Sequence, residues 1–215
     1  MALIMYLTKA PRYKNIMTDE YEAIPREDIE LIEKYFNWGK AREEGKSKSN
    51  TLQEWCGALE NQLPHKYIVN YYREFFTEKT IYTEGIGEVK HYGIFDQVGR
   101  IVKANQIFNW FIKNVMSNDV SNKYYEVTKD QLKNLLDVCI AIKNTITIID
   151  DDEYKVNEEM AKAVLPLLKI QGYFFGTSSY GIVYAKQVLN TIDVITNILE
   201  TTDFEKETVY FNAIW

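Results

Sequence analysis

The chain of 215 residues has little of several residue types on which particular protein classes depend. Its 2 cysteines, Cys56 and Cys139, cannot build a disulfide framework, and we expect both thiols to be reduced and buried. With 10 glycines and 4 prolines the chain is not fibrous. No apolar run approaches the roughly 18 residues that cross a bilayer, and Met1–Leu7 lacks the flanks of a signal peptide. These shortages favour a globular cytoplasmic protein without a membrane partner.

Histidine is equally scarce, with only His65 and His91 in the chain. Neither has a second histidine or a cysteine at the spacing of zinc ligands, so the sequence predicts no metal and no cofactor. Dinucleotide, Walker and nucleophile-elbow motifs are missing as well, and on balance we do not expect an enzyme. A histidine beside a carboxylate such as Glu88 can still act as a general base. A small hydrolase that uses His65 or His91 is therefore one alternative function.

Basic charge is in short supply, because 25 Lys and Arg face 31 Asp and Glu and give a net charge of −6. Residues 126–215 contain 14 acidic and 8 basic side chains, so the whole excess lies there. A nucleic-acid binder needs a basic face, so direct nucleic-acid binding is not expected. The acidic third is either a surface that attracts a basic partner or an ordinary solvated face.

The densest acidic cluster, and a pair of neighbouring tyrosines, are the candidate partner-binding residues. Tyrosines are effective interface anchors because they bury much area at a low cost in conformational entropy. Oxygen-rich clusters can also hold Mg²⁺ or Ca²⁺, but this one lacks alternating ligand spacing, and a solvated break between two helices is the plainer interpretation. The candidate residues are Asp150, Asp151, Asp152, Glu153, Tyr124 and Tyr125.

Periodicity and capping signals predict a mainly α (α+β) fold, with about six helices packed as one body around a small antiparallel or mixed sheet. The strongest helices are Asp96–Met116, a segment from the capping box of Thr128 and Gln131 to about Ile142, and Tyr180–Glu200. A short helix is predicted at Asn157–Leu165. The candidate strands are Met1–Leu7, residues 80–94, Tyr173–Phe175 and Val209–Phe211.

The N-terminal quarter is predicted to form a separate arm. Pro25 begins a helix to about Trp38, and the polar, mixed-charge stretch Gly39–Asn50 is the best linker candidate. Further helices are expected at Thr51–Leu63 and from Pro64 to about Thr77. The predicted organisation is therefore an arm, residues 1–48, and a main helical body with a small sheet, residues 49–215, which can also be read as one continuous domain.

Two features are candidates for ligand binding. Asn105 and Asn109 lie inside the apolar stripe of the predicted Asp96–Met116 helix, so their amides either pair with backbone at the ends of neighbouring elements or line a polar pocket. Small residues before the last long helix, Gly176, Thr177, Ser178 and Ser179, either cap that helix or cradle a phosphate. Together these residues support a second alternative function, the sequestration of a small nucleotide signal.

Three segments resemble a family of small phage and prophage proteins: Met1–Leu7 (MALIMYL), Lys103–Val115 (KANQIFNWFIKNV) and Gly172–Tyr184 (GYFFGTSSYGIVY). Members typically have a Gly-Leu-Asp-Met-Tyr-Leu-like opening, a Lys-Ala-Asn-x-Ile-His-Asn-Trp-Phe-like helix and an aromatic-Phe-Gly-Ser-Thr-x-Tyr-like turn. Ala2, Ile4 and Phe108 replace the Gly, Asp and His of that pattern, and Gly181–Val183 replaces an acidic stretch. The resemblance implies a phage origin, and any site built on that histidine and those carboxylates is absent here.

These observations favour a phage-encoded accessory protein that acts by protein binding. The expected partner is a host defence protein, such as a CRISPR–Cas component, in the cytoplasm of a bacterial host cell. Self-association is left open. The nucleotide-sequestering protein and the histidine-dependent hydrolase are the two alternatives from other functional classes.

Overall fold

The computed structural model describes residues 2–15, 18–24, 75, 77–83, 87–119, 121–150, 153–168 and 175–215. The chain divides into two compact units. Unit 1 consists of Met1–Thr8, Val98–Phe204 and Val209–Trp215, and unit 2 of Lys9–Gln97 and Glu205–Thr208. The division between the units falls within three strands, β1, β6 and β10. The candidate residues predicted in the second half of the chain therefore all belong to unit 1.

A four-stranded antiparallel sheet is prominent in the structure, and this overturns the prediction of a mainly α fold with about six helices. The strand order is β6-β1-β10-β7, formed by β6 (Asp96–Val102), β1 (Ile4–Pro11), β10 (Glu207–Ile214) and β7 (Tyr125–Val127). The fold is α+β. The sequence analysis placed β1 and β10 correctly but read Asp96–Val102 as the start of a long helix and did not foresee the short strand β7.

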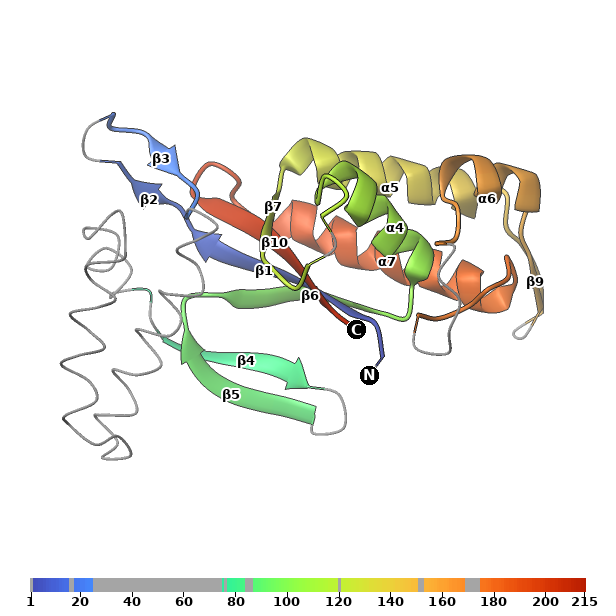
Figure 1. The fold of residues 1–215 in the computed structure, drawn as a ribbon, viewed down its shortest axis with the longest axis horizontal. Helices are drawn as coiled ribbons and strands as arrows, with labels where there is room; N and C mark the ends of the chain where they lie inside the picture. Colours follow the sequence, from blue (N-terminus) through green and yellow to red (C-terminus); the bar gives the residue numbers. More distant parts are fainter. Residues whose placement is uncertain are drawn as a thin grey trace. The chain divides into compact units, whose positions relative to one another are not determined.

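Three helices of unit 1 lie where the sequence predicted them. Helix α5 (Lys129–Lys143) begins after Thr128, whose side chain and that of Gln131 form the predicted capping box. Helix α6 (Glu158–Val164) is capped by Asn157 and ends just before Pro166. Helix α7 (Ile182–Thr201) is the predicted last long helix, and it packs beside α5 (Figure 1). These three predictions are confirmed to within two residues at each end.

The predicted helix Asp96–Met116 is wrong in its first half. Residues Asp96–Val102 form strand β6, and only Asn105–Asn114 form helix α4. Within β6 burial alternates, since Gly99 and Ile101 are buried and their neighbours are half-buried. A Cβ at Gly99 would lie 2.6 Å from Val194 Cγ1 of α7, so the glycine allows the helix to approach the strand closely. Pairing with β1 and this close contact decide the conformation against the helical periodicity.

The core of unit 1 joins the sheet to the helices. Met5 and Leu7 of β1 and Phe211 of β10 are fully buried in the same cluster as the inner faces of α4, α5 and α7. The rings of Phe111 and Phe211 stack at 3.9 Å with an interplanar angle of 11°. Eight consecutive residues of α4, Asn105–Ile112, are buried. A polar side chain in this helix therefore has to find its hydrogen bonds inside the protein.

The strand predictions hold at three of four places. Strand β10 contains the whole predicted segment Val209–Phe211, and β1 contains the predicted segment Met1–Leu7 except for its first three residues. Strands β4 (Thr77–Thr83) and β5 (Gly87–Gly93) form a hairpin in the predicted region 80–94, and β4 begins three residues before that region. Most of Tyr173–Phe175 lies outside the described residues. Between α5 and α6 the expected break is instead a small hairpin of β8 (Thr147–Asp150) and β9 (Glu153–Lys155).

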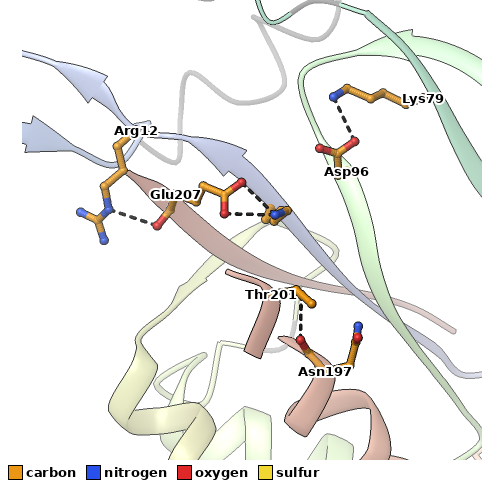
Figure 2. Close-up of polar contacts among 7 residues, drawn as sticks. Arg12, Lys79, Asp96, Asn197, Thr201 and Glu207 are labelled. Atoms are coloured by element: carbon orange, nitrogen blue, oxygen red, sulfur yellow. Dashed lines mark hydrogen bonds and ion pairs between the residues drawn. The ribbon is translucent and has the colours of Figure 1, made fainter. Parts of the chain in front are cut away.

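Unit 2 has its own short hairpin and ion pairs. Strands β2 (Tyr13–Lys14) and β3 (Tyr21–Glu22) pair antiparallel. Lys9 Nζ lies 2.9 Å from a carboxylate oxygen of Glu207. Lys79 Nζ lies 2.9 Å from a carboxylate oxygen of Asp96 (Figure 2). The side chains of Lys9 and Lys79 are 18% and 15% exposed, so these pairs are less screened than ordinary surface pairs.

Several predictions lie outside the described residues. They are the helix from Pro25, the linker Gly39–Asn50, the helix at Thr51–Leu63, most of the helix from Pro64, and the boundary between residues 48 and 49. The predicted end of the helix from Pro64, at about Thr77, is wrong because Thr77 is the first residue of β4. None of the helices in the described part of the chain combines the length and the apolar character that a bilayer crossing requires.

Candidate functional site

The candidate site lies where β6 turns into α4. Lys103 occupies the turn with φ 53°, and its N–H donates to the carbonyl of Leu3 at 2.9 Å. The next residue, Ala104, forms an isolated antiparallel bridge with Gly176. Segments from the beginning, middle and end of the chain therefore meet at one junction. They belong to the same three segments that carry the resemblance to phage proteins.

Gly176 allows this junction to close. Its φ is +104°, a conformation that L residues with a side chain rarely adopt. A Cβ at this position would lie 1.7 Å from the carbonyl oxygen of Lys103, which is far inside a contact distance. The predicted role of Gly176 in a phosphate-binding turn is not needed to explain the residue, because the close approach of two backbones already requires glycine.

The two buried asparagines of α4 bind the chain's own backbone. Asn105 Nδ2 donates to the carbonyl of Thr177 at 2.7 Å, and its Oδ1 accepts from the N–H of Leu168 at 3.4 Å. Asn109 Nδ2 donates to the carbonyl of Pro166 at 2.9 Å. Of the two alternatives left open by the sequence, the structure contains the pairing with backbone of neighbouring segments. Asn105 thus lies beside Thr177, another predicted site residue, and both asparagines bond the segment Pro166–Leu168, which was not predicted.

Two tyrosines, which sequence reasoning missed, complete this set of contacts. Tyr180 Oη accepts from the N–H of Leu167 at 3.2 Å, and Tyr184 Oη donates to the carbonyl of Leu165 at 3.0 Å. Their rings are 5.1 Å apart, which is the contact expected from residues four apart at a helix start. Burial, with smaller contributions from Cys139 and Tyr180, raises the pKa of Tyr184 above its ordinary value. The four-residue spacing was the available signal, but by itself it does not name a partner.

A pair of glutamines extends the polar contacts into α7. Gln106 Nε2 donates to Gln187 Oε1 at 3.0 Å, and Gln187 Nε2 donates to the carbonyl of Lys103 at 2.5 Å. Gln106 is fully buried, and its Oε1 has no hydrogen-bond partner in the described part of the chain. The sequence analysis did not single out these residues. The pair ties the strand-to-helix turn to the second turn of α7.

The predicted turn before α7 is formed, but it does not cap the helix. Thr177 Oγ1 accepts from the N–H of Ser179 at 3.1 Å and donates to the carbonyl of Ser179 at 3.0 Å, while Ser178 is exposed. The N-cap of α7 is Gly181, which makes no side-chain hydrogen bond to the helix. The expected cap at Thr177–Ser179 is therefore wrong, because the turn ends two residues before the cap position.

Of the candidate partner-binding residues, only the two tyrosines have described side chains. Tyr125 is only 5% exposed, and its hydroxyl donates to the carbonyl of Asp119 at 2.9 Å, so its ring belongs to the core. Tyr124 is half-buried. Asp150 pairs in register with Glu153 at the turn of the β8–β9 hairpin. The two residues between them, Asp151 and Asp152, lie outside the described residues.

Of the remaining reactive groups, only the thiol of Cys139 has a described side chain. Cys139 is fully buried, and burial raises its pKa to about 12, so the thiol stays protonated and unreactive at neutral pH. His91 lies opposite Lys79 in the β4–β5 register, three positions from Glu88, and His65 is outside the described residues. Among the residues that the structure describes, no group of three or more His, Cys, Asp and Glu side chains could hold a metal ion.

Large aliphatic side chains are exposed around the junction of α5, α6 and α7. Ile140 of α5 is 38% exposed, Val164 of α6 is 40% exposed, and Val183 of α7 is 49% exposed. In the chain, Ile140 follows Cys139, Val164 precedes Leu165 and Val183 precedes Tyr184, and all three of these neighbours are buried. The Tyr184 hydroxyl donates to the carbonyl of Leu165, and its ring lies near Cys139.

The site thus combines two features. One is a buried polar junction whose amides are bonded to the chain's own backbone, and the other is a set of three exposed aliphatic side chains on α5, α6 and α7. No protein-family model, curated protein or solved structure matches this chain.

Proposed function

We propose that the protein acts by binding another protein through the exposed junction of α5, α6 and α7. In this proposal it is a phage-encoded accessory protein in the cytoplasm of a bacterial host, and its partner is a defence protein such as a CRISPR–Cas component. The observation that carries the binding function is the exposure of three aliphatic side chains, Ile140, Val164 and Val183. The resemblance to phage proteins supports the biological setting.

Exposed aliphatic side chains are common singly but matter when they gather at one place. Ile140, Val164 and Val183 come from three helices whose inner residues converge, and each leaves more than a third of its surface in water. Covering such side chains stabilises a complex by about 25 cal/mol for each Å² removed from water. A partner that covers all three gains affinity from a fixed surface, because regular helices hold them and little ordering is needed.

The charges beside the three aliphatic side chains are mixed. Exposed lysines lie within about one turn of each of them, Lys143 on α5, Lys162 on α6 and Lys186 on α7, and exposed Asp137 lies one turn before Ile140. The acidic residues Asp193 and Glu200 lie farther along α7. Charges of this kind affect the association rate and its salt dependence more than the affinity, so the binding proposal rests on the aliphatic side chains.

The test begins with purification of the tagged protein from phage-infected bacteria and identification of the captured protein. The captured protein is then purified alone, and its dissociation constant is measured for the wild type and for the variant Ile140→Gln/Val164→Gln/Val183→Gln. Glutamine keeps helix propensity and removes the apolar surface. We expect the affinity to fall at least about 100-fold, which corresponds to about 2.7 kcal/mol.

A matched control is Ile214→Gln, which changes an exposed isoleucine of β10 that is 36% exposed and lies outside the three helices. This variant should bind like the wild type. Equal loss in the control and the triple variant, or wild-type affinity in the triple variant, would place the interface elsewhere. Failure to recover a defence protein in any complex would remove the proposed biological role.

A further inference from the structure

The segment that follows α6, Pro166–Leu168, is held to the protein by side chains. The Pro166 carbonyl accepts from Asn109 at 2.9 Å, the Leu167 N–H donates to Tyr180 Oη at 3.2 Å, and the Leu168 N–H donates to Asn105 Oδ1 at 3.4 Å. We call Pro166–Leu168 the strap. Three consecutive residues thus each use one backbone group to bond a side chain, two from α4 and one from the turn before α7.

This attachment differs from that of the neighbouring elements. In the described part of the chain, no backbone-to-backbone hydrogen bond holds the strap, whereas Leu165 just before it closes the last turn of α6 through Ala161 at 3.0 Å. All three strap residues are half-buried, while Leu165 is 1% exposed. The strap is therefore a short surface layer that starts from a fixed, buried anchor.

We propose that Pro166–Leu168 opens and closes as one unit while the sheet and helices of unit 1 stay folded. Its three hydrogen bonds are made by adjacent residues, so the loss of one gives the others more freedom and weakens them together. Leu167 and Leu168 pack against the edge of the core, and opening the strap exposes them and the groups beneath them while the sheet and helices stay packed, so it requires less free energy than unfolding the core. Release frees Asn109 Nδ2 and Asn105 Oδ1, whereas Asn105 Nδ2 keeps its bond to the carbonyl of Thr177; the two asparagines are 7% and 3% exposed when the strap is closed. This device does not depend on the proposed function.

The test is amide hydrogen exchange in the full chain carrying Asn109→Leu, read at single residues by NMR. Asn109 donates to the carbonyl of Pro166, and Pro166 itself has no N–H. The substitution therefore leaves the acceptors of the Leu167 and Leu168 amides in place. If the strap moves as a unit, exchange at Leu167 and Leu168 nevertheless becomes about three- to tenfold faster. The amide of Phe211 in β10, which reports global opening, should keep its wild-type rate.

Asn114→Leu is the matched control. It removes an asparagine from the same helix, where Asn114 Nδ2 donates to the carbonyl of Trp110 within α4 at 2.8 Å. We expect strap exchange to be unchanged. Unaltered exchange at Leu167 and Leu168 in the Asn109→Leu variant would show that the three bonds are independent and would overturn the proposal. An equal acceleration at Phe211 would also overturn it, because opening would then be global.

Tyr180→Phe supplies a second variant if Asn109→Leu does not fold. Tyr180 is half-buried, and the change removes only the acceptor of the Leu167 N–H. A strap that opens as a unit then exchanges faster at Leu168 as well. Faster exchange at Leu167 alone would contradict the proposal.

Discussion

The backbones of Gly176 and Lys103 approach so closely that no side chain fits between them. A Cβ on Gly176 would lie 1.7 Å from the Lys103 carbonyl oxygen, and both residues have positive φ, at 104° and 53°. The same carbonyl accepts the Gln187 amide at 2.5 Å. One close contact thus holds the strand-to-helix turn, the segment before α7 and the second turn of α7 in a fixed arrangement.

The first prediction concerns this contact. Gly176→Ala should lower the free energy of unfolding by more than about 3 kcal/mol, because it adds a backbone clash to an unfavourable φ. The measurement is chemical denaturation followed by circular dichroism. Gly87→Ala is the control, since Gly87 has φ +88° but nothing within 4 Å of an added Cβ. This variant should lower the free energy of unfolding only through its unfavourable φ, by about 1–2 kcal/mol. Equal costs would show that the Gly176 contact has little effect on stability.

A second prediction concerns the packing of α7 on β6. Gly99→Ala places a methyl group 2.6 Å from Val194 Cγ1, which should destabilise the protein by about 1–3 kcal/mol. Val194→Ala removes the opposing atoms, so the double variant should recover a part of that loss. A double-mutant cycle of thermal unfolding measures the coupling. Additive effects of the two changes would mean that the helix does not press on the strand at Gly99.

A third prediction uses the pH dependence of stability. The Cys139 pKa is raised by burial from 9.0 to about 12, so the folded thiol keeps its proton after the unfolded thiol has lost it. The contribution of Cys139 is therefore fully present below pH 9 and is lost as pH rises from about 9 to about 12. Its slope reaches at most about 1.4 kcal/mol per pH unit.

The comparison is between the wild type and Cys139→Ala, each measured by denaturant unfolding from pH 7 to pH 11. The variant loses about 1 kcal/mol of packing at every pH, and its stability should fall less steeply above pH 9. Tyr184 remains in both proteins and continues to contribute to the alkaline loss, since its pKa is raised as well. Parallel curves would show that the thiol is ionised as easily in the folded state as in the unfolded state.

Local signals in the sequence located the helices that begin with a capping residue. Thr128 with Gln131, and Asn157 before Pro166, place α5 and α6 because a cap and a stop act through neighbours in the chain. Residues 96–104 could not be assigned in this way. Their two valines and one isoleucine fit a helical stripe, but strand pairing with β1 and contact with α7, both distant in sequence, decide the outcome.

The candidate site was foreseen in part for the same reason. Asn105 and Asn109 stand out because polar amides in an apolar stripe require partners, and the structure supplies them. Tyr180 and Gln187 gave no such signal, since both residue types are common at a helix surface. The predicted surface tyrosine Tyr125 is buried because its hydroxyl finds a backbone acceptor at Asp119. A sequence shows which side chains need a partner more readily than which partner they find.

The central claim is that the protein acts by occupying a partner surface. The direct measurement is a titration of the purified defence effector, at a concentration well above the dissociation constant, with increasing amounts of this protein. Occupancy predicts that effector activity falls linearly and reaches its minimum near one molecule of protein per binding site, at all incubation times. Progressive inactivation by amounts far below that ratio would mean that the protein turns over, and would contradict the account.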